Sequence, residues 1–139
     1  MHAAIHIIGC DGYELIVDEN IRKAAEMANA IRNRSDFELL VTPETNVLWY
    51  RYVPTAWRTA LVQGRLTCSA NIEINHLSEM LQKVQFEGGS RMIIKKMCED
   101  KRISVVALRA VIGNPFTSEA DLETVLEDQA RIARQLEIS

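Results

Sequence analysis

The sequence is poor in the residues and motifs that most readily reveal a function. Its 139 residues include only 3 cysteines, 3 prolines and 6 glycines, and 6% of its residues are aromatic. It contains no GxSxG, HExxH, GxxxxGK[ST] or GxGxxG motif, which argues against the common hydrolase, zinc-protease and nucleotide-binding classes. It also lacks a long apolar run and a signal-like N-terminal segment. We therefore identify no catalytic set by motif, and we expect a cytoplasmic location.

Charge and cysteine usage exclude further classes. The net charge of -3 at pH 7 argues against a nucleic acid or an anionic membrane as partner, because phosphate binding depends on clustered lysine and arginine. The odd number of widely spaced cysteines, without any CxxC pair, is typical of reduced thiols. No metal site is expected, since none of the possible ligands has zinc-site spacing. These possible ligands are Cys10, Cys68, Cys98, His2, His6 and His76.

The composition is that of one ordinary globular domain, with 47% hydrophobic and 25% charged residues. Apolar residues at helical spacing and β-branched runs bounded by turn residues define the elements. Helices are predicted over about 12–33, 71–87 and 117–136, and strands over 37–42, 47–53, 91–98 and 103–112. A short helical turn is predicted within the loop 54–70. This order predicts an α+β fold with three main helices on a two-layer, mostly antiparallel four-stranded sheet.

Capping residues support the predicted helix ends. Asp11 and Glu14 have the spacing of a capping box ahead of the first helix. Asn71 is predicted to cap the second helix, which the two glycines at 88 and 89 would end. Thr117 or Ser118 is predicted to cap the last helix.

Arg109 is the most informative residue, because it interrupts an apolar strand shortly before a capped helix. Side chains alternate along a strand, so Arg109 is expected to share a face with Val105, Ala107 and Val111. A guanidinium on such a face stays charged and requires an anion, which could be a carboxylate, a phosphate or a substrate. A structural ion pair or an edge residue with its charged head in water explains the pattern equally well.

Several segments, in colinear order over nearly the whole chain, resemble the C-terminal domain of the pyridoxal-phosphate-dependent amino-acid decarboxylases. This family holds the glutamate, aromatic amino-acid, cysteine sulfinate and 2,4-diaminobutyrate decarboxylases. Residues 91–102 match no pattern of the family. The matching segments are GCDGYE at 9–14, FELLV and PETNV within 37–47, RYVP at 51–54, the helix 71–82 with EGGS at 87–90, and LRAV and NPFT within 108–117.

The resemblance implies that residues 1–10 end a connecting helix and that 11–139 form the small C-terminal domain of a type I fold enzyme. In that family a large domain, absent from this chain, holds the cofactor on a lysine that follows a histidine. This chain has no His-Lys pair, so pyridoxal 5'-phosphate is expected in the intact, homodimeric enzyme and not on this chain alone. Arg109 matches the arginine that binds the substrate carboxylate.

Two other hypotheses remain open at this point. The chain could be a free-standing α+β binding or dimerisation module derived from such a domain, with Arg109 or an exposed apolar sheet facing the partner. An independent small enzyme is the third hypothesis, although no nucleophile is placed beside a base.

Overall fold

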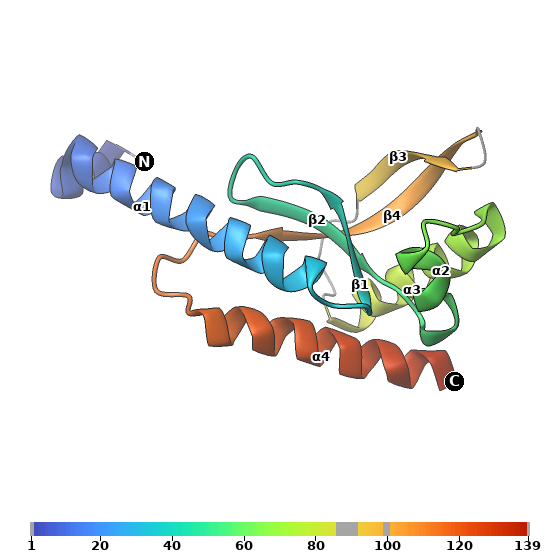
Figure 1. Cartoon of the computed structure of the whole chain (residues 1–139). Coiled ribbons are helices and arrows are strands. Elements are labelled where there is room, and N and C mark those ends of the chain that lie inside the picture. Colours follow the sequence, from blue (N-terminus) through green and yellow to red (C-terminus); the bar gives the residue numbers. More distant parts are fainter. Residues whose placement is uncertain (1, 86–91, 99–100, 139) are drawn as a thin grey trace.

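The computed structural model describes residues 2–85, 92–98 and 101–138, and within them the side chains of 9–85 and 103–138. None of the described helices is long and apolar enough to cross a membrane. The elements follow in the order α1 (His2–Arg32), β1 (Phe37–Val41), β2 (Val47–Tyr52), η1 (Thr55–Trp57), α2 (Arg58–Val62), α3 (Cys68–Gln85), β3 (Met92–Cys98), β4 (Lys101–Val111) and α4 (Glu119–Ile138). The chain is thus α+β, as predicted, and Figure 1 shows its arrangement.

The sheet differs from the predicted four-stranded layer. All pairings are antiparallel and the strand order is β1-β2-β4-β3, but β2 and β3 pair with different halves of β4. β3 pairs with Lys101 to Ala107, and β2 pairs with Leu108 to Val111. The result is a three-stranded sheet of β1, β2 and the second half of β4, extended by a two-stranded ribbon. The long strand β4 was correctly predicted, but sequence could not show which half each neighbour would use.

Asn75 of α3 explains why β2 and β3 do not lie on opposite sides of the same half of β4. Its Nδ2 donates to the carbonyl oxygen of Ser104 at 2.7 Å, and its Oδ1 accepts from the amide of Val106 at 2.9 Å. The side-chain amide therefore satisfies the edge of β4 that a continuing β2 would have bonded. Beyond this point β2 can leave the sheet without leaving buried backbone groups unpaired.

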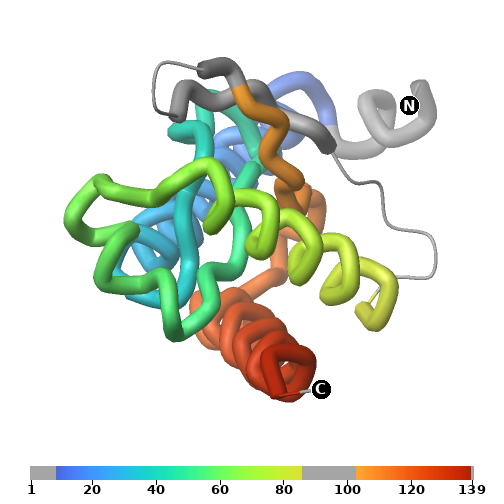
Figure 2. The backbone as a smooth tube through the Cα atoms, turned by 90° about the vertical axis from the view of Figure 1, so that its right-hand side faces the viewer, coloured from blue at the N-terminus to red at the C-terminus, as the bar shows by residue number. Residues whose placement is uncertain are grey.

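Helices α1, α3 and α4 bury the apolar core against the sheet, as the three predicted helices were expected to do. Figure 2 shows α4 nearly end-on below the strands and α3 running beside β4, whereas the first half of α1 projects beyond the sheet in Figure 1. The core takes Leu48, Tyr50 and Tyr52 from β2 and alternate residues from β4. The helices contribute Ala24, Met27, Ala28, Ile31, Leu77, Leu81, Leu122, Leu126, Ala130 and Ala133.

Two of the three predicted caps are wrong in position. Gly9 has φ 76° and ψ 170° and interrupts α1, and the helix resumes at Cys10, so Asp11 lies in the first turn after the break and does not precede the helix as a cap would. Such a positive φ is readily adopted only by glycine. At α3 the capping oxygen is Thr67 Oγ1, which accepts from the amide of Ala70 at 3.2 Å, while Asn71 is buried one turn later and donates to the Thr67 carbonyl. The predicted stop at residues 88 and 89 lies outside the described residues.

The cap of α4 agrees with the prediction. Ser118 Oγ accepts from the amide of Asp121 at 3.2 Å, and Asp121 Oδ2 accepts from the amide of Ser118 at 2.8 Å. These reciprocal bonds form a capping box, and the bonds from Ser118 lower the pKa of Asp121. The start of α4, and with it the short loop after β4, is therefore held in place.

Candidate functional site

Arg109 lies in the second half of β4, on the sheet face opposite α1 and α4, and its side chain is exposed. Val105 and Ala107 share this face and are buried, whereas Val111 is 52% exposed. The face changes from buried to open between Ala107 and Arg109, where β4 exchanges β3 for β2 as its neighbour. Arg109 shares its face with Val105, Ala107 and Val111 as expected, but this face is covered along only the first half of the strand.

The Arg109 guanidinium lies over the ring of Trp49, with 5.6 Å between its central carbon and the ring centroid. The two residues are register partners on β4 and β2, and Val41 of β1 is the partner of Trp49 on its other side. A row of Val41, Trp49 and Arg109 thus crosses the open face of the three-stranded sheet. Within the described part of the chain, no carboxylate forms an ion pair with Arg109.

A cavity of about 630 Å³ adjoins Arg109 at the edge of β4 that β2 does not occupy. Asn46 and β2 bond the opposite edge, where the amide of Ile112 donates to the carbonyl of Asn46 at 2.9 Å. Because backbone groups alternate along a strand, those of Arg109 and Val111 point toward the cavity edge. The polar side chains on the cavity wall include Gln82, Asn114, Thr117 and Gln129. Its volume lies within the range of small-molecule sites.

The wall of this cavity on the helix side is fixed by Tyr50. Its hydroxyl donates to Oε1 of Gln129 in α4 at 3.0 Å, and both side chains are buried. Burial raises the pKa of Tyr50 to about 12, because the phenolate would lose its hydration. Tyr50 therefore stays protonated at neutral pH and serves as a hydrogen-bond donor that ties β2 to α4.

The loop after β4 is held from two sides. Asn46 Nδ2 donates to the carbonyl of Ile112 at 2.8 Å, and the buried Lys23 of α1 donates through Nζ to the carbonyl of Pro115. Asn114 Oδ1 accepts from the amide of Phe116 at 2.9 Å and closes a tight turn. The ring of Phe116 is consequently presented to solvent, with 89% of the residue exposed.

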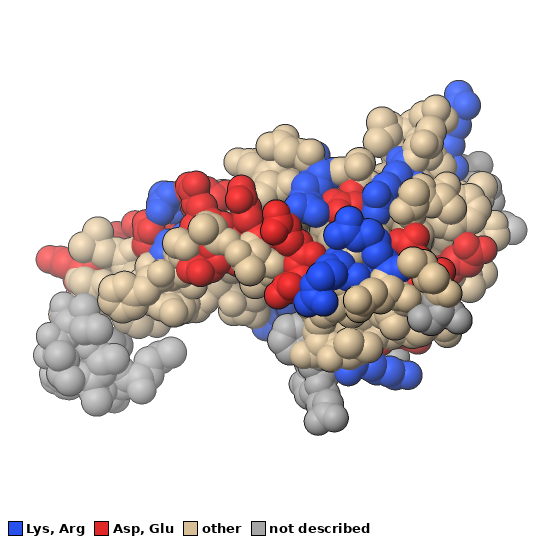
Figure 3. Space-filling model, turned by 90° about the horizontal axis from the view of Figure 1, so that it is seen from below, with Lys and Arg blue, Asp and Glu red and all other residues tan. Residues whose placement is uncertain are grey.

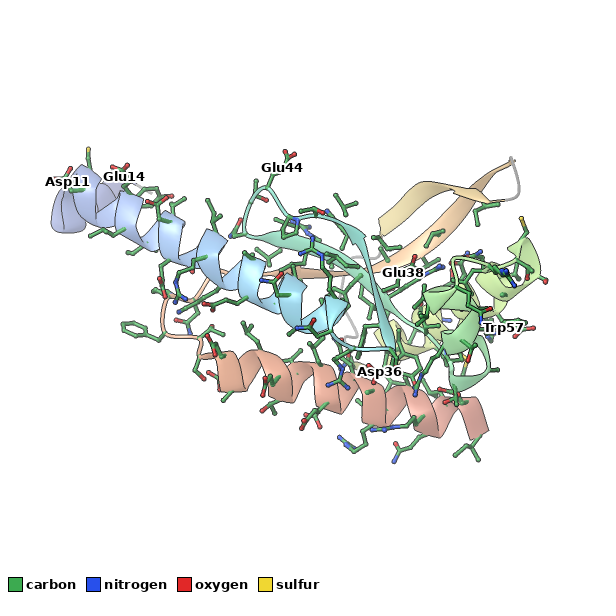
Figure 4. The ribbon with its side chains drawn as sticks, viewed as in Figure 1. Asp11, Glu14, Asp36, Glu38, Glu44 and Trp57 are labelled. Atoms are coloured by element: carbon green, nitrogen blue, oxygen red, sulfur yellow. The ribbon has the colours of Figure 1, made fainter. Side chains whose placement is uncertain are left out.

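Arg51 is the buried arginine that sequence reasoning missed. It lies on β2 with 0% exposure; its Nε donates to Oε2 of Glu38 on β1 at 2.6 Å. Glu38 lies against the sheet, unlike Glu44, which points away from the molecule at the β1–β2 turn (Figure 4). The argument that a buried guanidinium requires an anion thus applies to Arg51. The hairpin register, which pairs Glu38 with Arg51, was the signal that could have shown it.

A cluster of acidic side chains lies on the face that α1 and α4 form. Figure 3 shows them over α1 and the start of α4, where Glu26, Glu119 and Glu123 line a smaller cavity of about 200 Å³. Arg22 pairs with Glu19 at 2.6 Å and also with Glu26. Within the described residues, no group of three histidine, cysteine or acidic side chains has the geometry of a metal site.

Two lysines have described side chains, and neither fits the role of a cofactor-holding residue. Lys23 Nζ is engaged by the Pro115 carbonyl and lies 3.6 Å from Glu19, while Lys83 is exposed on α3. Neither residue lines the cavity beside Arg109. A Schiff base with pyridoxal phosphate requires a lysine amine that faces its site, so these described residues do not fit the cofactor.

Comparison with known proteins finds a curated decarboxylase and several solved decarboxylase structures that resemble the chain. No protein-family model matches the chain. An aspartate 1-decarboxylase of Aliivibrio fischeri is 33% identical over 146 aligned residues, which cover 100% of this chain and 26% of the relative. The chain thus spans about a quarter of the length of this relative.

Mouse CSAD superposes with a TM-score of 0.71 and 19% identity over 94% of this chain and 26% of its own. The glutamate decarboxylase domain of a Vibrio parahaemolyticus transaminase and L-2,4-diaminobutyrate decarboxylase gives 0.66 and 19%, covering 94% and 24%. Oryza sativa TDC, solved with PLP and tryptamine, gives 0.63 and 12%, covering 95% and 25%. These structural neighbours are pyridoxal-phosphate-dependent amino-acid decarboxylases, and the chain shares the fold of about a quarter of each.

Proposed function

We propose that the chain is the C-terminal domain of a pyridoxal-phosphate-dependent L-amino-acid decarboxylase and is not catalytic alone. In this proposal residues 11–139 form the small domain and residues 1–10 end the segment that connects it to a large, cofactor-binding domain. The likeness to an aspartate 1-decarboxylase along the whole chain, and over only 26% of that relative, supports this assignment. The likeness in fold to a quarter of several decarboxylase chains supports it independently.

The observation that carries the proposal is that the Arg109 guanidinium is available to bind an anion. Its guanidinium is exposed, is held over Trp49 and has no ion-pair partner in the described part of the chain. Arginine presents its N–H groups in a planar fork that matches a carboxylate. We assign to Arg109 the binding of the substrate carboxylate, which would fix the orientation of the amino acid before carbon dioxide is lost.

The exposed apolar residues around Arg109 support docking against a further domain. Val111 and Val41 on the open sheet face are 52% and 44% exposed, and Phe116 in the loop after β4 is 89% exposed. Apolar groups of this kind are expected where a soluble domain meets a partner. We assign this side to the large domain and the second subunit of a homodimer, so that docking would close the active site over Arg109.

The cofactor supplies the electron sink for the carbanion that decarboxylation leaves. Because neither described lysine faces the Arg109 cavity, the proposal places the cofactor-holding lysine in the large domain. The contribution of this chain is then binding, orientation and the exclusion of water.

Substitution of Arg109 in the full-length decarboxylase tests the function. Arg109→Met is expected to weaken binding of the amino-acid substrate by about 2 to 5 kcal/mol, since a desolvated carboxylate loses its cation. Arg131→Met is the matched control, because Arg131 is an exposed arginine of α4 that pairs with Asp128 at 3.0 Å. The measurement is the steady-state KM and kcat of both variants with the amino-acid substrate. Unchanged KM and kcat for Arg109→Met would remove the assigned role.

A second experiment separates the decarboxylase from the free-standing module. The polypeptide that carries this domain is purified from its source, and its mass and absorbance are measured. A chain about four times longer that shows the absorbance band of bound pyridoxal phosphate is expected, whereas the domain alone should show no such band. A mature 139-residue protein without a cofactor-binding domain would contradict the proposal and favour a binding module.

A further inference from the structure

We propose that Trp49 is a positioning residue for Arg109 and that the two form one subsite for a single carboxylate on an apolar carbon skeleton. This inference rests on the proposed function, which assigns carboxylate binding to Arg109. It adds a second residue to the site and states how the guanidinium is kept available. Nothing in the sequence motif around Arg109 indicates Trp49, which lies 60 residues earlier on another strand.

The position of Trp49 is fixed by the central strand of the three-stranded sheet. It lies on β2, which is bonded on both edges, to β1 and to β4, and its register partner on β4 is Arg109 itself. Directly paired side chains of neighbouring strands touch, and an aromatic ring attracts a guanidinium placed over its face. The 5.6 Å separation is within the range of that attraction. Trp49 thus restrains an otherwise flexible side chain.

Comparison with two other arginines shows what is particular about this contact. Arg34 lies 5.4 Å from the centre of the Phe37 ring, but its N–H groups also donate to both carboxylate oxygens of Asp36 at 2.8 Å. Arg58 lies 5.6 Å from the centre of the Tyr52 ring and donates to the Tyr52 hydroxyl. Their donors are used within the fold.

Arg109 differs, because no hydrogen bond from its guanidinium to any of the described residues accompanies its ring contact. The contact with Trp49 orients the cation through a ring, which accepts no strong hydrogen bond. It therefore leaves the planar fork of N–H donors for an external carboxylate.

The surroundings of the pair define the ligand class. Val41 flanks Trp49 in the same row, and Val111 lies beyond Arg109 on the same face, so a single cation is set among apolar surfaces. Such a row matches one carboxylate attached to uncharged carbon atoms. The subsite contacts only the carboxylate end of a ligand. The loss of Trp49 should therefore weaken the binding of every carboxylate ligand to a similar degree.

Kinetics of the full-length decarboxylase test this role. Trp49→Leu is expected to raise KM for the amino acid about 3- to 30-fold, while kcat changes less than twofold. Inhibition by propionate, a simple carboxylate, should weaken by the same factor. Trp49→Phe keeps an aromatic face and should recover most of the loss. Trp57→Leu is the control, because Trp57 is the other tryptophan and contacts Glu73 at 2.9 Å, not Arg109.

The contact itself is tested by NMR on the 139-residue protein. The Nε–H proton of Arg109 should be displaced upfield by the Trp49 ring current, and Trp49→Leu should abolish the displacement while Trp49→Phe retains part of it. If the Arg109 proton of the wild-type protein shows no upfield displacement, the inference is wrong, while the proposed role of Arg109 in carboxylate binding is unaffected.

The two arms separate this inference from the proposed function. If Arg109→Met impairs the enzyme but Trp49→Leu leaves KM and propionate inhibition unchanged, Trp49 is not a positioning residue and the function stands. If Arg109→Met has no effect, the proposed function fails first. A Trp49→Leu effect on kcat alone, with no recovery in Trp49→Phe, would also contradict a positioning role.

Discussion

Separating Arg51 from Glu38 should cost far more than removing both. Arg51 is fully buried, and its Nη1 has no acceptor among the described residues, so Glu38 carries the compensation of its charge. Glu38→Leu leaves a guanidinium without its carboxylate in the interior and is expected to destabilise the fold by about 3 to 5 kcal/mol. Arg51→Met should cost less, about 1 to 3 kcal/mol, because the Glu38 side chain is 12% exposed and retains access to water.

The double variant Arg51→Met with Glu38→Leu removes both charges and fills the space with apolar atoms. Replacing a buried ion pair in this way is often neutral or stabilising, so the double variant should be more stable than Glu38→Leu alone. Urea denaturation of the four proteins, followed by circular dichroism, gives the free energy of unfolding of each and the coupling between the sites. Additive losses, with the double variant as the least stable protein, would refute the reasoning that the buried charges compensate each other.

Two further predictions concern hydrogen bonds that hold the site. Spectrophotometric titration should show Tyr50 ionising near pH 12; since the raised pKa means that the folded state favours the neutral phenol, its stabilising contribution is complete below pH 10 and is lost as the pH rises through 12. A Tyr50 that ionises near pH 10, the ordinary value of a tyrosine, would contradict its burial. Asn75→Leu should destabilise the protein by about 1 to 3 kcal/mol and accelerate amide exchange at Val106, whereas unchanged exchange there would show that Asn75 does not close the edge of β4.

Local signals in the sequence predicted most of the elements but not their assembly. Ser118 and Asp121 have the spacing of a capping box, which depends on neighbours in the chain, and the box forms. Asn71 is also a residue type that favours the N-cap position, yet Thr67 caps α3 because the helix begins one turn earlier. Short-range chemistry limits where a helix can begin, and packing against β4 selects among the possibilities.

In the candidate site, too, local patterns predicted single residues but not the contacts between them. Arg109 could be singled out from its strand, but whether its face is covered depends on where α3 and β3 lie, which no local pattern specifies. Trp49 becomes its partner only through the β2–β4 register, and Arg51 becomes the buried arginine only through the β1–β2 register. Contacts across strands are set by pairing between distant segments, so they escape periodicity arguments.

The bond from Lys23 to the Pro115 carbonyl has a mechanical consequence. It joins the second half of α1 to the loop that directly follows β4, and Asn46 joins the start of the same loop to the turn before β2. Helix, loop and sheet are thereby coupled into one stiff unit, with the first half of α1 projecting from it as a lever arm (Figure 1). A movement of the first half of α1 relative to a partner would therefore move the whole sheet with it. Arg109 and Trp49 would move together and keep their mutual geometry.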